Sequence, residues 1–249
     1  MKKILKDRIR NSKGVFLFLD FDGTVSKIVS RPGSAKFFPP AKQLIKSFQN
    51  REDVMVSIVT GRSLKDVRKK VGLKNVVYAA NHGMEIYYNG RYLLKKGEKY
   101  KRPLNSLGKE IKRSLRKIPG TVVENKGYSI AVHFRAVKKS RHREVRDVVK
   151  ELARPYLKKY RLQMTTGKMV YEIRPQNFWN KGKAVKWIWK RLAPDFLPCY
   201  CGDDITDEDA FKSLKKSGVT IRVGTKKGSV AKTSVRSVED LVKLLKKVI

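Results

Sequence analysis

Carboxylates follow two of the apolar stretches in this 249-residue chain. Asp20 and Asp22 come directly after the run Val15–Leu19, and Asp203 follows a second apolar stretch over 197–201. Uninterrupted apolar runs are typical of strands buried on both faces of a parallel sheet, and the carboxyl ends of such strands meet at one edge. Carboxylates brought together repel one another unless a cation or a shared proton intervenes. Because the pattern offers hard oxygen ligands and no Cys/His cluster, the expected metal is Mg²⁺.

A doubly wound parallel sheet is expected to carry these motifs. Strand and helix patterns alternate through the first third of the chain, and the same rhythm returns after Pro175. The expected strands span residues 15–19, 54–59, 75–80, 197–201 and 219–223, and the expected helices span 40–50, 63–70, 181–192, 207–216 and a segment from 238. This alternation predicts an α/β core of the Rossmann-like type.

The middle of the chain has a different pattern, typical of a small α+β insertion. Residues 84–94 alternate around Asn89-Gly90, which is a strong hairpin signal. Two amphipathic helices are then expected over 104–118 and 141–156, and strands over 121–124, 128–135, 161–165 and 169–174. We therefore expect a discontinuous core domain of residues 1–95 and 176–249, and an inserted α+β cap domain of residues 96–175.

The acidic motif is one of a set of sequence blocks that resemble a known family. Asp20-Phe21-Asp22-Gly23-Thr24 resembles the D-x-D-G-T signature of the haloacid dehalogenase-like phosphatases, and Thr60, Lys181 and Gly202-Asp203-Asp204 stand where the other three motifs belong. Further blocks resemble trehalose-6-phosphate phosphatases: Asn81-His82-Gly83, Glu124-Asn125-Lys126, His133-Phe134-Arg135, Glu172-Ile173-Arg174-Pro175, Trp179-Asn180-Lys181-Gly182 and residues 202–211. These blocks run in order over about residues 15 to 225, nearly the whole chain.

The resemblance implies a Mg²⁺-dependent phosphatase that works through an aspartyl-phosphate. Asp20 would attack phosphorus, which replaces one difficult displacement by two easier ones. Asp22 would protonate the leaving sugar oxygen and then deprotonate the hydrolytic water. Mg²⁺ would be held by Asp20, the backbone carbonyl of Asp22 and Asp203, and would offset the repulsion between an anionic nucleophile and an anionic substrate.

Four more residues are assigned to the phosphate and metal site by the same resemblance. Thr60 offers a hydroxyl near a helix N-terminus and Lys181 a fixed positive charge, and both suit a phosphoryl oxygen. Asp204 and Asp207 would support the metal or Lys181. A helix cap over 206–209 is compatible with that role, because acids stabilise the positive end of a helix.

The residues that would contact the sugar come from both expected domains. They are Glu124, Lys126, Glu172 and Arg174 in the cap domain, and Gly23, Arg62, Asn81 and His82 in the core domain. Structural alternatives stay open, because Glu172 and Arg174 could form a cross-strand surface ion pair and His82 could be a hydrogen-bonded loop residue. His133 and Arg135 could face either the substrate or the solvent.

The expected reaction is hydrolysis of trehalose 6-phosphate to trehalose and phosphate, a step of trehalose biosynthesis. Sucrose phosphate and glycosyl-3-phosphoglycerate are the alternative substrates for the same chemistry. The family often has Gly-Ser-His-Gly where this chain has Ala80-Asn81-His82-Gly83, and Glu-Asp-Lys where it has Glu124-Asn125-Lys126. These departures leave the fine sugar specificity open.

The net charge of +37 raises an alternative of a different class, a basic nucleic-acid-binding protein. An excess of 59 Lys and Arg over 22 Asp and Glu predicts association with an anion: nucleic acid, an acidic membrane surface or a phosphorylated small molecule. The lysine runs are typical of solvated faces, and helical spacing places Trp189 in a core. We therefore expect a sugar-phosphate substrate, no membrane partner and no specific nucleic acid, with non-specific binding of nucleic acid at low salt.

The chain is expected to be cytoplasmic, as a monomer or a small oligomer. Lys2 and Lys3 precede an apolar stretch that is too short for a signal peptide or a spanning helix. Cys199 and Cys201 stand two apart in an expected strand, a spacing that suits neither a strain-free disulfide nor a zinc site. Reduced thiols are therefore expected at both positions.

Overall fold

The protein consists of a larger discontinuous unit and a smaller inserted unit. The computed structural model describes residues 2–29, 32–176, 179–225 and 227–249. The larger unit is Met1–Leu94 with Trp179–Ile249, and the smaller unit is Lys95–Phe178. Each unit has a sheet and a hydrophobic core of its own.

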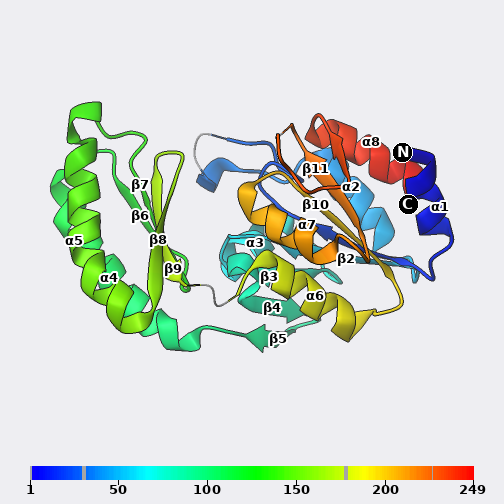
Figure 1. The fold of residues 1–249 in the computed structure, drawn as a ribbon, viewed down its shortest axis with the longest axis horizontal. Coiled ribbons are helices and arrows are strands. Elements are labelled where there is room, and N and C mark those ends of the chain that lie inside the picture. Colours follow the sequence, from blue (N-terminus) through cyan, green and yellow to red (C-terminus); the bar gives the residue numbers. More distant parts are fainter. Residues whose placement is uncertain (1, 30–31, 177–178, 226) are drawn as a thin grey trace. The chain divides into compact units, whose positions relative to one another are not determined.

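An eight-stranded sheet forms the larger unit (Figure 1). Its strands are β1 (Val15–Leu19), β2 (Val54–Val59), β3 (Val77–Ala80), β4 (Glu85–Tyr88), β5 (Arg91–Lys95), β10 (Leu197–Gly202), β11 (Val219–Val223) and β12 (Thr233–Val235). They follow the order β12-β11-β10-β1-β2-β3-β4-β5, with parallel pairing from β12 to β3 and antiparallel pairing of β3 with β4. The central strand β1 is buried along its whole length, as its continuous apolar sequence predicts.

Helices cover both faces of this sheet (Figure 1). They are α1 (Lys2–Arg10), α2 (Pro39–Phe48), α3 (Leu64–Val71), α6 (Lys181–Leu192), α7 (Glu208–Leu214) and α8 (Val238–Val248). Alternate residues of β1 point to opposite faces, so Val15, Leu17 and Leu19 pack with α2, α3 and α8. Phe16 and Phe18 pack with α6 and α7 on the other face. The core therefore has two layers separated by the sheet.

The register of β1 with its two neighbours aligns their carboxyl ends. Leu19 pairs with Cys201 of β10 on one side and with Ile58 of β2 on the other. The sheet also grows in opposite directions from this point, through β2 and β3 on one side and through β10 and β11 on the other. Such a reversal opens a crevice at the carboxyl ends of the strands, where α/β proteins bind ligands.

The smaller unit is a four-stranded antiparallel sheet covered on one face by two helices. The strands β6 (Val122–Asn125), β7 (Ile130–His133), β8 (Leu162–Gly167) and β9 (Val170–Pro175) lie in the order β6-β7-β9-β8. The helices α4 (Glu98–Ser114) and α5 (His142–Tyr160) share a hydrophobic core with Ile130, Val132 and Ile173. The intervening residues of these strands point to the opposite face of the sheet.

The predicted fold class, an α/β core with a doubly wound, mainly parallel sheet and an inserted α+β unit, is confirmed. The expected helix over 104–118 was wrong at both ends, because α4 runs over Glu98–Ser114 and contains Pro103, which is buried. The helix α5 likewise continues through Pro155 to Tyr160, beyond its expected end at 156. The helix α1 and the short strand β12 had not been expected.

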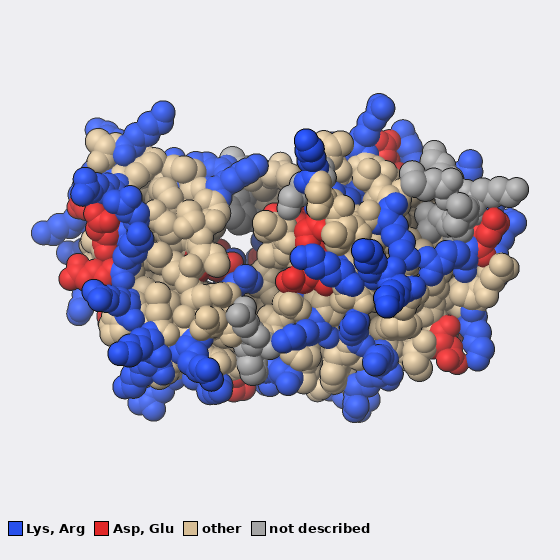
Figure 2. Space-filling view, in the orientation of Figure 1, with Lys and Arg blue, Asp and Glu red and all other residues tan. Residues whose placement is uncertain are grey.

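Positive charge dominates the surface. Lys and Arg side chains cover much of the face drawn in Figure 2, and Asp and Glu are sparse on it. The smaller unit alone holds 24 Lys and Arg against 7 Asp and Glu, a net charge of +17. Over the described ranges, no helix has both the length and the apolar character needed to cross a bilayer.

Candidate active site

Lys181 forms two buried ion pairs at the carboxyl edge of the larger sheet. Its Nζ lies 2.8 Å from Oδ1 of Asp20 and 2.8 Å from Oδ1 of Asp207. Asp20 follows β1, Lys181 is the first residue of α6, and Asp207 directly precedes α7. The Asn180 side chain caps α6 by accepting a hydrogen bond from the backbone N–H of Lys183, so the start of the helix that carries Lys181 is fixed.

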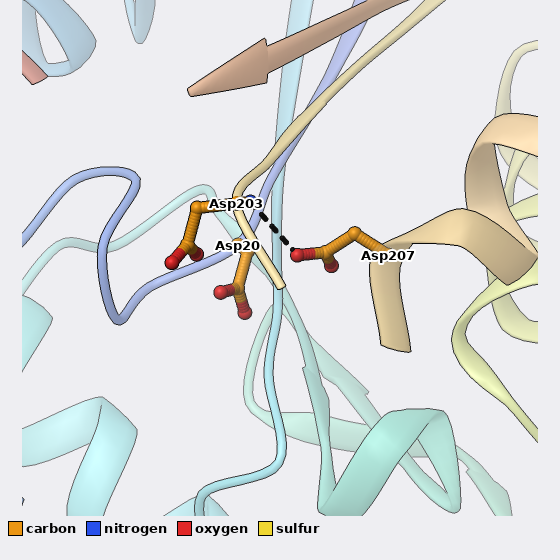
Figure 3. A group of neighbouring side chains, drawn as sticks. All are labelled: Asp20, Asp203 and Asp207. Carbon is orange, nitrogen blue, oxygen red and sulfur yellow. Dashed lines mark hydrogen bonds between the residues drawn. The ribbon is translucent and has the colours of Figure 1, made fainter. Parts of the chain in front are cut away.

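Asp203 completes a group of three acids (Figure 3). Asp20, Asp203 and Asp207 each offer a carboxylate oxygen within 4.8 Å of the others. Figure 3 shows Asp20 and Asp203 next to each other, with Asp207 approaching from the side of α7. The dashed line in the figure is the backbone N–H of Asp203, which donates to Oδ2 of Asp207 at 2.9 Å.

The three carboxylates differ in how their oxygens are used. Asp207 accepts from Lys181 and the Tyr200 hydroxyl at Oδ1, and from the backbone N–H groups of Asp203 and Asp204 at Oδ2. Among the described residues, only Lys181 donates to the Asp20 carboxylate, and only Thr24 donates to that of Asp203, at 3.3 Å. Asp207 is therefore saturated by protein donors, whereas Asp20 and Asp203 keep oxygens for a further partner.

Burial and mutual repulsion separate the pKa values of these acids. Burial raises the pKa of Asp20 well above its usual value despite the nearby Lys181. Burial and the charge of Asp207 raise the pKa of Asp203 to about 7. For Asp207, burial is outweighed by Lys181 and by its hydrogen bonds, so its pKa is lowered. A cation bound beside Asp20 and Asp203 would favour their ionised forms, and hard oxygen ligands of this kind suit Mg²⁺.

The carboxylate of Asp22 pairs with Arg62 instead of joining this group. Arg62 donates from Nε and Nη2 to the two oxygens of Asp22, at 2.7 and 2.6 Å, and from Nη1 to Asp66 at 2.6 Å. Arg62 is buried, whereas the Asp22 side chain is 48% exposed. Gly23 follows with φ +78°, and a Cβ atom there would lie 2.1 Å from Oδ2 of Asp203. Only glycine allows this close approach of the loop to Asp203.

A left-handed turn lies against the end of β2. Asn81, His82 and Gly83 have φ values of 51°, 58° and 87°. The backbone N–H of Asn81 donates to the carbonyl of Arg62, and that of His82 to the carbonyl of Thr60, each at 2.8 Å. The structure thereby brings Thr60, Arg62, Asn81 and His82 together in the larger unit. All four side chains are buried, and Asn81 donates from Nδ2 to Glu85 at 2.7 Å.

The four predicted residues of the smaller unit share one region of its sheet. Glu124 on β6 and Glu172 on β9 both stand opposite Ala131 of β7, so they lie on the same face. Lys126 Nζ lies 3.7 Å from Oε1 of Glu172. Arg174 follows two positions after Glu172 on the same strand and therefore on the same face, which means that these two residues do not form a cross-strand pair.

His133, whose orientation the sequence left open, lies on this same face. Its Nε2 is 3.3 Å from Oε2 of Glu124. Two other buried polar residues were missed entirely: Tyr200, which donates to Asp207 at 2.6 Å, and Arg222 on β11. Both lie in buried strands: all five residues of β11 are buried, and so is every residue of β10 except Leu197. A hydroxyl or guanidinium group in such a strand needs a buried partner, and this requirement could have identified them.

Some of the predicted site residues lie together in the larger unit, and others lie together in the smaller unit. Asp20, Lys181, Asp203 and Asp207 lie together in the larger unit, and the exposed Asp204 caps the turn before α7 in a reciprocal pair with Asp207. The Asp22–Arg62 pair and the turn at Asn81 belong to the larger unit as well. A buried carboxylate that has one oxygen bound to a fixed cation and the other unused is an arrangement that can act as a nucleophile.

Known proteins resemble this chain over most of its length. A family model described as trehalose-phosphatase matches residues 18–243. The chain is 35% identical over 220 residues to trehalose-phosphate phosphatase B of Arabidopsis thaliana, covering 83% of this chain and 58% of that protein. It is 36% identical over 213 residues to the trehalose-phosphate phosphatase of Mycobacterium tuberculosis H37Rv, covering 83% of this chain and 53% of that protein. The chain thus spans little more than half the length of these relatives.

Solved structures agree with the sequence comparison. A trehalose-6-phosphate phosphatase related protein has a TM-score of 0.80 and 25% identity, covering 93% of this chain and 96% of its own. The C-terminal domain of the Candida albicans trehalose-6-phosphate phosphatase has a TM-score of 0.81 and 22% identity, covering 99% and 96%. At 22% identity, the likeness to the Candida albicans domain shows a shared fold only. With the family model matched over nearly the whole chain, the resemblance is confirmed, and this chain belongs to the trehalose-phosphatase family.

Proposed function

We propose that this chain is a Mg²⁺-dependent phosphatase that hydrolyses trehalose 6-phosphate to trehalose and phosphate. The observation that carries the proposal is the buried Asp20, with one oxygen bound by Lys181 and the other without a donor among the described residues, in a chain of the trehalose-phosphatase family. An aspartate held in this way has one oxygen fixed in position and one available for attack on phosphorus.

Mg²⁺ fits the donor set of Asp20 and Asp203, with the backbone carbonyl of Asp22 as a third proposed ligand. The two carboxylates keep oxygens that no described protein donor uses. Their pKa values are raised first by burial and then by neighbouring acids, and a bound cation would offset both effects. When bound, Mg²⁺ supplies positive charge between the anionic nucleophile and the anionic phosphate. Asp207 has no free oxygen for the metal and instead holds Lys181 and the backbone of Asp203 and Asp204.

The proposed chemical steps use the side chains of Asp20, Asp22, Lys181 and Thr60. Oδ2 of Asp20 attacks phosphorus, and the bond from phosphorus to the sugar oxygen breaks as Asp22 gives that oxygen a proton. Water then attacks the phosphate on Asp20, with Asp22 accepting its proton, and the bond between Asp20 and phosphorus breaks to release phosphate. Lys181 and Thr60 donate to the phosphoryl oxygens and stabilise the charge that develops there.

The smaller unit is proposed to be the cap domain that selects the sugar. Glu124, Lys126, Glu172 and Arg174 are the proposed sugar contacts, and their common sheet face supports this role. Arg174 has a buried Nε without a hydrogen-bond partner among the described residues, which leaves a donor for a hydroxyl. Gly23, Arg62, Asn81 and His82 are the proposed contacts from the larger unit.

The test is phosphate release from a panel of trehalose 6-phosphate, sucrose 6-phosphate and glucosyl-3-phosphoglycerate, with Mg²⁺ and then with EDTA. We expect turnover of trehalose 6-phosphate only, lost in EDTA. The Asp20→Asn variant should lose turnover, whereas Asp195→Asn should keep it, because Asp195 is an exposed partner of Lys13. Equal release with and without metal, or full activity of Asp20→Asn, would refute the proposal. Preferred turnover of another substrate in the panel would refute the assignment of the sugar.

The cytoplasmic location and the partners are part of the same proposal. Cys199 and Cys201 are free and buried, which suits a reducing compartment. A sugar phosphate is the proposed ligand of a monomer or small oligomer. Association with nucleic acid is proposed to be non-specific and limited to low salt, as the net charge of +37 implies.

A further inference from the structure

Arg222 is a buried cation in the larger unit, on the strand next to one edge of its sheet. It lies on β11 with 7% of its surface exposed, and it pairs with Gly202, the last residue of β10. Burying a guanidinium group is costly, and its Nε finds no partner among the described residues. A well-packed apolar residue would stabilise this strand at lower cost. The position therefore calls for a reason other than stability.

The two arms of Arg222 connect two parts of the site. Nη1 donates to Oε1 of Glu208 at 3.1 Å, and Nη2 donates to the backbone carbonyl of Asp203. Glu208 is the first residue of α7, and its Oε2 accepts from the backbone N–H of Val230 at 3.0 Å. Arg222 thus links the end of β10 to the start of α7.

These contacts hold one peptide group from both sides. The peptide that joins Asp203 to Asp204 has its carbonyl bound by Arg222 and its N–H bound by Oδ2 of Asp207, at 2.9 Å for the N–H. The preceding N–H, that of Asp203 itself, also donates to Asp207. The backbone on each side of the Asp203 Cα is therefore fixed, and with it the direction in which the carboxylate leaves the chain.

We infer that Arg222, anchored by Glu208, is a positioning residue for the Asp203 carboxylate and thereby sets the affinity of the site for Mg²⁺. The inference rests on the proposed function, since it takes Asp203 as a metal ligand. Groups that orient metal ligands typically change metal affinity 10- to 100-fold when they are removed. Arg222 touches neither the proposed nucleophile nor the phosphate site through any contact described here, so its effect is on binding of the metal.

The experiment measures binding of Mg²⁺ alone to the full chain by calorimetry, with urea unfolding recorded for each variant. Arg222→Met should raise the Kd for Mg²⁺ about tenfold or more. Arg222→Lys keeps a cation opposite Glu208 but has no second arm for the Asp203 carbonyl, so it should fold and still bind Mg²⁺ more weakly. If Arg222→Met does not fold, the result for Arg222→Lys decides the test.

A matched control separates positioning from stability. Thr220 lies two residues before Arg222 on β11, is fully buried, and accepts from the backbone N–H of Lys232 at 2.8 Å. Thr220→Val should destabilise the protein and leave the Kd for Mg²⁺ unchanged. An unchanged Kd in Arg222→Lys, or an equal rise in Thr220→Val, would overturn the inference. Absence of Mg²⁺ binding by the unmodified chain would instead refute the proposed function.

Discussion

Replacing Lys181 by Met should destabilise the larger unit in a strongly pH-dependent way. The side chains of Lys181, Asp20 and Asp207 are 3%, 6% and 0% exposed, so solvent screens these charges little. Removing one partner of a buried ion pair typically costs about 3 to 5 kcal/mol. Because Lys181 serves two carboxylates at 2.8 Å each, we expect a loss near the upper limit, about 4 to 5 kcal/mol, at pH 8.

The sign of the pH dependence follows from the acids that remain. Without Lys181, burial and mutual repulsion raise the pKa values of Asp20 and Asp207 in the folded state. An acid whose folded pKa is raised contributes stability that is present at low pH and is lost as pH rises through that pKa. When the pH is lowered by one unit in the range where one such carboxyl group takes up a proton on folding, the free energy of unfolding of the variant rises by about 1.4 kcal/mol. Lowering the pH from 8 to 6 should therefore recover about 2 to 3 kcal/mol of the loss.

Urea unfolding followed by tryptophan fluorescence in EDTA measures this effect. All three tryptophans, Trp179, Trp187 and Trp189, belong to the larger unit, so the signal reports that unit. Lys183→Met is the control, because Lys183 is exposed on the same helix and should change the free energy of unfolding by less than about 0.5 kcal/mol. Equal losses at pH 6 and pH 8, or a loss below about 1 kcal/mol at pH 8, would refute the reasoning.

Two further predictions concern Asp203. Gly23→Ala should weaken Mg²⁺ binding about tenfold or more, because its Cβ would lie 2.1 Å from Oδ2 of Asp203. Gly90→Ala is the control, because Gly90 has a similar φ of +79° and nothing within 4 Å of an added Cβ, so it should leave the Kd unchanged. Because the pKa of Asp203 is raised to about 7, protons should compete with Mg²⁺, so affinity measured by calorimetry should fall as pH drops below 7 and level off above it. Affinity that is flat between pH 5 and 8 would contradict the second prediction.

The central part of the site could be predicted because it depends on local patterns and on parallel pairing. The run Val15–Leu19 ends at Asp20, and the register of Leu19 with Cys201 and Ile58 then places the strand ends side by side. A buried strand without alternation is recognisable from sequence alone. The position of Asp20 at the carboxyl edge followed directly from that pattern.

Contacts between side chains far apart in the chain could not be predicted. The Asp22–Arg62 pair joins residues 40 positions apart, and the Arg222 contact to Asp203 joins residues 19 positions apart. In Val-Thr-Ile-Arg-Val, the sequence of β11, an arginine reads as a solvent-facing residue, yet it is buried. The short strand β12 has a polar sequence, Thr-Ser-Val, and it forms because β11 offers an edge to pair with.

The acidic cluster and the basic exterior act over different distances. Seven of the 22 Asp and Glu lie in the two acidic motifs, at positions 20, 22, 203, 204, 207, 208 and 209, and the side chains nearest Lys181 are buried. At physiological salt, charges on the surface are screened beyond about 8 Å, so the net charge of +37 acts on an anion during its approach. The buried carboxylates are screened much less and would repel a bound phosphate at contact distance. Lys181 offsets only part of that repulsion, because both Asp20 and Asp207 share it. In the proposed reaction, the exterior charge would therefore speed the encounter with a sugar phosphate, but a cation at Asp20 and Asp203 would still be needed for the phosphate to reach Asp20, the proposed nucleophile.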